Sequence, residues 1–290
     1  MGLNTDELED LARQEGQPVY RGRQLAEWLY QRGARAFDEM TNLPEALRRR
    51  LAHTCFVGRS RVVVSLRGVD GTVKLLLEQE DGARVETVGL PYSDRTSCCV
   101  STQVGCPIGC AFCATGRSGY MRDLTAGEIV DQALTIQEAM CEPTLRPNDA
   151  CRVDHVTFMG MGEPLLNHDA TLKAVRLLNG EMGIAMRHLT VSTVGYVPGI
   201  RRLAAEGLQI TLAVSLHAPT DELRRHLIPG MAKWSVHEIV EACRDYVGDT
   251  GRRVTFEYCL LDGVNDSVAE ARELAAVLRG LNCHVNLIAY

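Results

Sequence analysis

Three cysteines within eight residues are the part of this sequence most able to do chemistry. Cys106, Cys110 and Cys113 form a C-x3-C-x2-C pattern directly after a predicted strand. Three thiolates on one loop can hold three irons of a four-iron cubane, and the remaining iron stays open to a small chelating ligand. A structural zinc site is the alternative, but such sites normally close with four protein ligands. The spacing and the strand placement therefore favour a [4Fe–4S] cluster.

A glycine-rich turn follows the next predicted barrel strand and ends in Gly162-Glu163-Pro164. Glycine lets the backbone approach a ligand closely, and the Glu163 carboxylate can accept hydrogen bonds from an ammonium group. Taken alone, such a turn often only reverses the chain. Here the turn follows a loop whose cysteines can hold a cluster, so it indicates a binding site for the ligand of that cluster.

Polar residues also follow the third and fourth predicted barrel strands. Ser192 ends one of these strands, and Ser215, Leu216 and His217 end the other. For either serine, capping of the next helix is the ordinary explanation. Because both serines stand at the ends of predicted barrel strands, as the Gly162-Glu163 turn does, their positions favour a place in the same ligand-binding site.

The elements that must position these residues fall into three parts. Residues 1–54 are predicted to form a helical unit, and residues 55–94 a small β extension with Asp-Gly turns at 70–71 and 81–82. Residues 95–290 alternate apolar strands with helices, with strands at about 98–103, 153–159, 188–193, 210–216, 253–260 and 284–289. This pattern predicts an α/β fold with a partial (β/α)6 barrel, in which chemistry sits at the C-terminal strand ends.

Composition sets only broad limits on function. The chain has 290 residues, 46% of them hydrophobic, and a net charge of -6, so any contact with nucleic acid must come from local patches. No apolar run reaches the length of a membrane span, and the acidic start is unlike a signal peptide. We expect a cytoplasmic protein that makes no use of a membrane.

Together, the cysteine loop and the glycine-glutamate turn resemble those of the radical SAM superfamily, in which S-adenosylmethionine (SAM) binds the open iron. More specifically, the chain resembles the RlmN/Cfr family of radical SAM RNA methyltransferases, and within it the RlmN branch. The resemblance covers nearly the whole chain. It is carried by four segments, Phe37–Pro44, Cys99–Cys106, Gly160–Asn167 and Val214–Pro219.

The resemblance implies methylation of adenine carbon 2 in large-subunit ribosomal RNA and in certain tRNAs. It implies two uses of SAM: one molecule methylates a cysteine near the C-terminus, and another is cleaved at the cluster to a 5′-deoxyadenosyl radical. It further implies an electron donor such as flavodoxin or ferredoxin, and we expect a monomer. By motif position, Cys99 would be the thiol that releases the product through a disulfide, and Glu86 the proton acceptor.

Each of these two assignments has an ordinary alternative. Glu86 could be a surface glutamate on a strand, and Cys98 stands beside Cys99. Because neighbouring strand residues face opposite ways, at most one of the two cysteines should face an active site.

The sequence also departs from the family, because it ends at Tyr290, before the family's methyl-carrying cysteine. None of five other cysteines lies in the expected motif, and packing is their ordinary role: Cys141, Cys151, Cys243, Cys259 and Cys283. We therefore expect a truncated product whose last strand is exposed. This product should lack methyl transfer even if it binds the cluster and SAM.

Contact with RNA would rest on arginines of the helical unit, which suit phosphate binding. They are Arg21, Arg23, Arg32, Arg35, Arg48, Arg49 and Arg50. Acidic residues lie between them, and a solvated helix surface explains mixed charge as well. The alternative functions are a radical SAM enzyme that acts on a small molecule or peptide, and a metal-bound RNA-binding module without catalysis.

Overall fold

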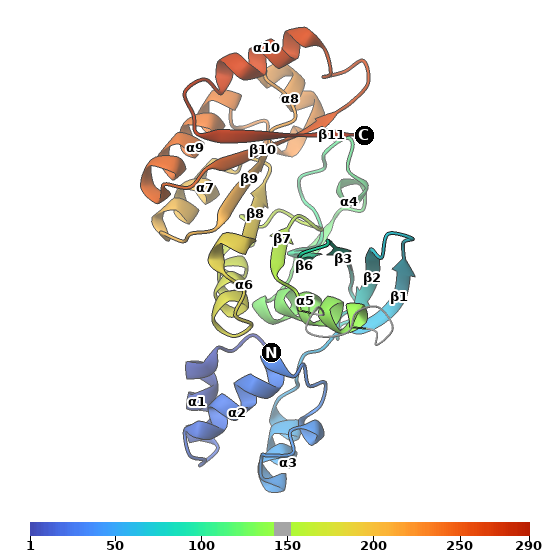
Figure 1. Cartoon of the computed structure of the whole chain (residues 1–290), viewed down its shortest axis with the longest axis vertical. Helices are drawn as coiled ribbons and strands as arrows, with labels where there is room; N and C mark the ends of the chain where they lie inside the picture. Colours follow the sequence, from blue (N-terminus) through green and yellow to red (C-terminus); the bar gives the residue numbers. More distant parts are fainter. Residues whose placement is uncertain (142–151) are drawn as a thin grey trace. The chain divides into compact units, whose positions relative to one another are not determined.

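The structure is a computed structural model that describes residues 1–141 and 152–290 (Figure 1). The chain divides into two compact units. Unit 1 contains Met1–Ser101, Leu124–Val156 and Asp169–Ala185, and unit 2 contains Thr102–Asp123, Thr157–His168 and Met186–Tyr290. The division falls within β7 (His155–Phe158) and at the start of α6 (His168–Gly180).

Unit 1 begins with short helices, as predicted for its first residues. They are α1 (Thr5–Gln14), α2 (Tyr20–Ala26), the π-helical turn η1 (Glu27–Gln31), the 3-10 turn η2 (Phe37–Glu39) and α3 (Glu45–Thr54). Asn4 starts α1 through a capping box, because its side chain accepts from the Glu7 N–H and Glu7 accepts from the Asn4 N–H. Leu25 and Leu29, four residues apart, are both buried, so they lie on one apolar face.

Four antiparallel strands follow in unit 1: β1 (Arg61–Arg67), β2 (Val73–Glu78), β3 (Arg84–Pro91) and β4 (Thr96–Cys99). The two predicted Asp-Gly turns connect β1 to β2 and β2 to β3, which confirms them. Val73, Leu75 and Leu77 alternate with more exposed residues, so one face of β2 is apolar. The helix α5 (Ala126–Met140) packs against β2 and β3.

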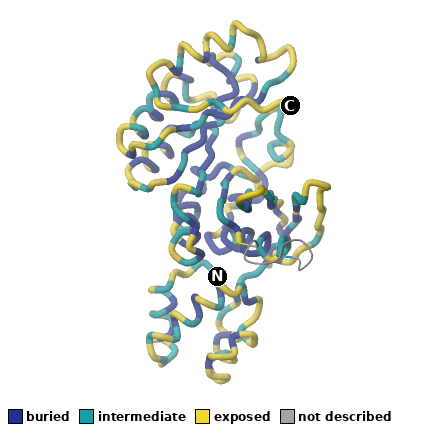
Figure 2. The backbone as a smooth tube through the Cα atoms, in the orientation of Figure 1, coloured by how far each residue is buried: buried dark blue, intermediate teal, exposed yellow. Residues whose placement is uncertain are grey.

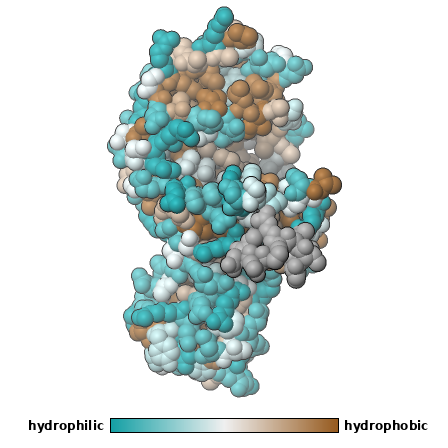
Figure 3. Space-filling model, in the orientation of Figure 1, coloured by the Kyte–Doolittle hydropathy of each residue, from teal (hydrophilic) through white to brown (hydrophobic). Residues whose placement is uncertain are grey.

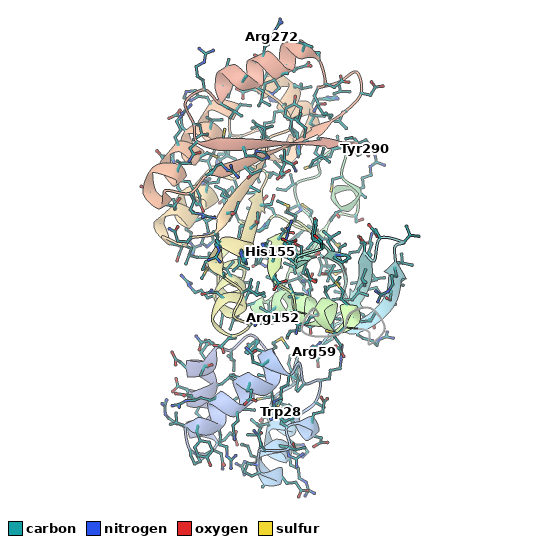
Figure 4. All side chains as sticks on the ribbon, viewed as in Figure 1. Trp28, Arg59, Arg152, His155, Arg272 and Tyr290 are labelled. Carbon is teal, nitrogen blue, oxygen red and sulfur yellow. The ribbon has the colours of Figure 1, made fainter. Side chains whose placement is uncertain are left out.

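Arg59 joins the helical segment of unit 1 to α5, and its position is labelled in Figure 4. The Arg59 side chain is 3% exposed and pairs with Asp131 of α5, which is 1% exposed. It also donates to the Gly33 carbonyl, and the Ser60 N–H donates to Asp131 at 2.8 Å. A buried ion pair with several hydrogen bonds therefore fixes this part of the unit.

The strand predicted at 98–103 is wrong in its extent. β4 ends at Cys99, and Gln103–Gly105 forms β5, which pairs with β6 (Tyr120–Asp123) in a separate two-stranded sheet. The intervening backbone turns to other partners: the Ser101 N–H donates to the Gln132 side chain, and the Thr102 N–H donates to the Met161 carbonyl. These hydrogen bonds take the place of a continued ladder.

Unit 2 carries four parallel strands in chain order: β8 (Leu189–Thr193), β9 (Thr211–Ser215), β10 (Val254–Leu260) and β11 (Cys283–Ala289). The helices between them are α7 (Val197–Ala205), α8 (Asp221–Leu227), α9 (Val236–Thr250) and α10 (Val268–Val277). The remaining short elements are α4 (Ala114–Arg117), η3 (Met186–His188) and η4 (Pro229–Met231). Alternation of parallel strands with helices confirms the predicted α/β class.

The core of unit 2 lies along its middle strands, as the burial colouring in Figure 2 shows. Val191, Leu212, Val214 and Phe256 are fully buried. Side chains of β11 are mostly exposed, among them Leu287, and apolar side chains reach the surface of unit 2 in Figure 3. None of the helices in the described ranges has the length and apolar content that crossing a membrane requires.

Candidate radical SAM site

The three motif cysteines lie on one loop of unit 2, between β5 and α4. Backbone hydrogen bonds fix the loop: the Cys106 N–H donates to the Gly119 carbonyl at 2.8 Å, and the Ala111 N–H donates to the Leu227 carbonyl at 2.9 Å. All three cysteines are partly buried, and their thiols interact electrostatically with one another. The sequence pattern therefore produces a shared thiol site.

Burial raises the pKa of the Cys106 thiol and raises that of Cys110 to about 12. Buried thiols such as these lose their protons only when a bound cation compensates the negative charge of the thiolates. Bound iron would supply that positive charge. Within residues 1–141 and 152–290, no three His, Cys, Asp or Glu side chains converge on a site for one metal ion. Ligands to three separate irons of a cubane do not have to converge on one point, so this loop fits a [4Fe–4S] cluster.

Gly162 occupies a position that requires glycine. Its φ is +106°, and a Cβ there would lie 2.6 Å from the Cβ of Gln103. The Gly162 N–H donates to the Cys106 sulfur, and the Glu163 N–H donates to Gln103 Oε1 at 2.8 Å. The glycine-glutamate turn and the cysteine loop are thus in direct contact.

The Glu163 carboxylate is 1% exposed and binds backbone of its own unit. It accepts from the Val194 N–H at 2.8 Å and from the Leu165 N–H at 3.1 Å, and the Thr193 hydroxyl also donates to it. Burial raises the pKa of Glu163 to about 7, although these hydrogen bonds favour the charged form. The carboxylate therefore holds the turn after β8 beside the cluster loop.

Ser192 and Ser215 lie at the C-terminal ends of β8 and β9. The helix-capping explanation is wrong for both, because the residue that precedes α7 is Tyr196 and the cap of α8 is Thr220, which accepts from the Leu223 N–H. Since neither serine caps a helix, both stay candidates for ligand contacts at the strand ends.

Leu216 and His217 continue from β9 toward the cluster loop. The Leu216 side chain is fully buried, so only its backbone can reach a ligand. His217 has φ 58°, and its Nδ1 accepts from the Cys259 N–H at 2.9 Å. Its ring meets that of Phe112 of the cysteine loop edge-on, with centroids 4.9 Å apart. Burial lowers the pKa of His217 to about 4, so the ring is neutral, with its proton on Nε2.

Three further residues support the site but were not predicted from the sequence. Gln103 orients Glu163, as described above. Asn265 is 1% exposed, donates to the carbonyls of His217 and Cys259, and so holds the turn of His217. Arg224 is a buried arginine on α8. Its spacing from Leu227 by three residues was the available signal, because it places Arg224 on the apolar face of the helix.

Glu86 and Cys99 lie in unit 1, on β3 and β4. Cys99 pairs with Val88 and Cys98 with Gly89. Cys98 is fully buried beside Thr87, whereas Cys99 is partly exposed. The Glu86 side chain is 47% exposed and pairs with Lys74 at 2.8 Å. One of the two cysteines is thus committed to the core, as strand alternation predicts.

The arginines proposed for RNA contact all have partners within unit 1. Arg23 pairs with Glu9 at 2.7 Å, and Arg50 pairs with Glu15 at 3.0 Å. The others pair with a carboxylate or donate to a backbone carbonyl: Arg21, Arg32, Arg35, Arg48 and Arg49. Of the other cysteines, Cys243 and Cys259 are buried as expected, Cys141 and Cys283 are only partly buried, and Cys151 lies outside the described residues.

Known proteins resemble this chain over its whole length. Residues 100–275 match the radical SAM superfamily, and residues 1–57 match the ribosomal RNA large subunit methyltransferase N-terminal domain. The chain is 54% identical to the probable dual-specificity RNA methyltransferase RlmN of Gloeobacter violaceus, over 100% of this chain and 80% of that protein. It is 51% identical to the protein of the same name from Thermosynechococcus vestitus, over 100% of this chain and 83% of that protein.

A solved structure resembles the whole chain as well. The crystal structure of a radical SAM methyltransferase from Sphaerobacter thermophilus matches with a TM-score of 0.92 and 48% identity, over 99% of this chain and 83% of that one. Similarity at this level extends from the N-terminal helices through the last strand. The chain therefore belongs to the radical SAM superfamily and, within it, to the RlmN family of RNA methyltransferases.

Proposed function

We propose that this protein methylates carbon 2 of adenosine in large-subunit ribosomal RNA and in certain tRNAs, in the cytoplasm and as a monomer. The family's cofactors are a [4Fe–4S] cluster and SAM. The observation that carries the proposal is the contact of the cysteine loop with both predicted SAM-binding segments, through Gly162 on one side and His217 on the other.

Cys106, Cys110 and Cys113 would hold the cluster, and Gly162, Glu163, Ser192, Ser215, Leu216 and His217 would form the SAM site. An adenine carbon 2 is not nucleophilic, so it cannot attack the methyl group of SAM directly. With both cofactors bound, reduction by a donor such as flavodoxin or ferredoxin would supply a 5′-deoxyadenosyl radical, which avoids that obstacle. The neutral His217 ring keeps one N–H donor at Nε2, and the fixed turn at Gly162 offers backbone to SAM.

Within unit 1, we assign Glu86 as the proton acceptor and Cys99 as the thiol that forms the disulfide on product release. Support comes from their positions: both are on neighbouring strands of one sheet, and both are open to solvent in part. A thiol that attacks sulfur must be reachable and able to ionise, which the buried Cys98 is not. Burial raises the pKa of the Cys98 thiol far above its usual range.

The cluster assignment is tested by anaerobic reconstitution. We expect about four irons and four sulfides per chain, because three thiolates support a cubane with one open iron. Cys106→Ala, Cys110→Ala and Cys113→Ala should each lose them. Cys55→Ala is the matched control, since Cys55 is partly buried in unit 1 and should leave the content unchanged. Stoichiometric zinc without sulfide would refute the assignment.

The RNA target is tested separately with the complete product of the gene that encodes this sequence. Expressed in a host without its own enzyme of this type, it should restore 2-methyladenosine in ribosomal RNA and tRNA, measured by mass spectrometry of digested RNA. Methylation at carbon 8 would reassign the position. Cleavage of SAM with no methylated RNA would favour a small-molecule or peptide substrate.

A further inference from the structure

Arg224 is a buried cation in the interior of unit 2. Its side chain points inward from α8, and the residue is 2% exposed. One terminal nitrogen, Nη2, donates to the Val194 carbonyl, while Nε is buried and has no hydrogen-bond partner among the residues described. A guanidinium taken out of water is costly unless its charge is compensated nearby. A negatively charged group beside Arg224 would therefore offset the cost of burying its guanidinium.

The groups around Arg224 belong to the cluster site. Its electrostatic partners are Cys110, Asp221 and Glu163, in that order. The cysteine loop is bonded to the same helix, because the Ala111 N–H donates to the carbonyl of Leu227, which lies one turn after Arg224. The loop and helix pack around an apolar group of residues: Ile108, Ala218, Leu227, Ile228 and Met231. Apolar surroundings screen charges weakly, so the electrostatic interaction between Arg224 and nearby charged groups is strong.

The neighbouring acids already serve other donors. Asp221 Oδ1 accepts from the Val236 N–H at 2.6 Å, and Glu163 binds the turn after β8. Burial disfavours the ionised form of Cys110 as a free thiol. Once three cysteines bind iron as thiolates, however, they bring permanent negative charge to this side of Arg224.

We propose that Arg224 compensates the negative charge of the cluster and its cysteine ligands and so raises the reduction potential of the cluster. This rests on the proposed function. Reduction by one electron adds one negative charge, so a buried cation stabilises the reduced form more than the oxidised form. A hydrogen bond from the unpartnered Nε–H to a cluster sulfur would act in the same direction. Arg224 is thus a positioning and charge-balancing residue.

The test is a redox titration of the reconstituted full-length protein, followed by electron paramagnetic resonance of the reduced cluster. Arg224→Gln should shift the midpoint potential to more negative values at full iron and sulfide content, and Arg224→Lys, which keeps the charge, should stay near the parent. Arg225→Gln is the matched control: it removes the same charge one residue along, at an exposed position. We expect Arg225→Gln to leave the midpoint potential of the cluster unchanged, because water screens the charge of Arg225.

The outcomes separate this inference from the proposed function. If the parent takes up no cluster, the proposed function fails. If Arg224→Gln carries a full cluster at the parent's potential, only the role of Arg224 fails. Should Arg224→Gln keep its fold but lose the cluster while Arg224→Lys retains it, the charge is required and the inference stands. If both variants unfold equally, as judged by circular dichroism, Arg224 is required for folding whether or not its charge is kept, and the inference is overturned.

Discussion

Cys99 and Glu86 lie on the same face of the antiparallel sheet of unit 1. Cys99 stands opposite Val88 on the neighbouring strand, and Glu86 is two residues from Val88, so all three side chains point the same way. Cys98, opposite Gly89, points to the other face, which α5 covers. The ladder register thus groups the proposed thiol with the proposed proton acceptor and separates the adjacent cysteine from both.

The first prediction follows from this register. In the full-length protein, Cys99→Ala should block product release and leave RNA attached to the protein, because no thiol remains to form the disulfide. Cys98→Ala should release methylated RNA normally and lower stability by about 1 kcal/mol through lost packing. Denaturing gels with labelled RNA, together with thermal melting, measure both effects. Trapped RNA with Cys98→Ala and normal turnover with Cys99→Ala would reverse the assignment.

The second prediction concerns Gly162. Gly162→Ala should destabilise the fold by about 1–3 kcal/mol, since alanine is strained at positive φ, and should also weaken SAM binding, because the added Cβ would strike Gln103. Gly109→Ala is the matched control: Gly109 has φ +68° on the cysteine loop, but a Cβ there meets nothing within 4 Å. Calorimetric SAM binding to reconstituted protein should fall for Gly162→Ala well beyond the control. Equal losses would mean that backbone strain alone matters.

The third prediction concerns the buried ion pair of unit 1. Arg59→Met should cost about 3–5 kcal/mol, because Asp131 is then left buried without its cation. Arg61→Met is the control, since Arg61 pairs with Glu78 on the surface and should cost about 1 kcal/mol or less. Urea unfolding of the purified protein gives both values. A small effect of Arg59→Met would show that the hydrogen bonds from Ser60 and Thr135 alone satisfy Asp131.

Much of the fold was predictable because its signals are local. The helices of residues 1–54 and the Asp-Gly turns at 70–71 and 81–82 each depend on neighbouring residues. The extent of the first barrel strand was not predictable, because it ends where Gln132 and Met161, distant in sequence, take over the backbone hydrogen bonds of Ser101 and Thr102. Long-range partners decide such strand ends.

The site divides in the same way. The cysteine spacing and the need for glycine at Gly162 are visible in the sequence, since each reflects a chemical or backbone requirement at one place. The supporting residues are harder to find: Arg224 lies beside the exposed Arg225, and in the sequence only its spacing of three residues from the apolar Leu227 distinguishes it. The serine-capping explanation was wrong for a similar reason, because the caps of α7 and α8 lie several residues beyond the strand ends.

The last prediction concerns the pH dependence that His217 gives to the fold. Burial lowers its pKa from 6.5 to about 4 in the folded protein. Between these values the unfolded chain binds a proton that the folded chain does not, so stability falls as the pH falls from 6.5 toward 4 and is unaffected by this group above 6.5. The pKa difference corresponds to about 3 kcal/mol at its full extent.

His217→Asn isolates this effect. Asparagine tolerates positive φ, and its Oδ1 can replace Nδ1 as acceptor for the Cys259 N–H, but it does not titrate. Urea unfolding of iron-free parent and variant at several pH values should show that the parent loses stability relative to His217→Asn as the pH drops below 6.5, while above it the difference is constant. Parallel pH profiles would mean that the imidazole takes up its proton in the folded state as readily as in the unfolded chain, which its burial against Phe112 and its neighbour Arg224 should prevent.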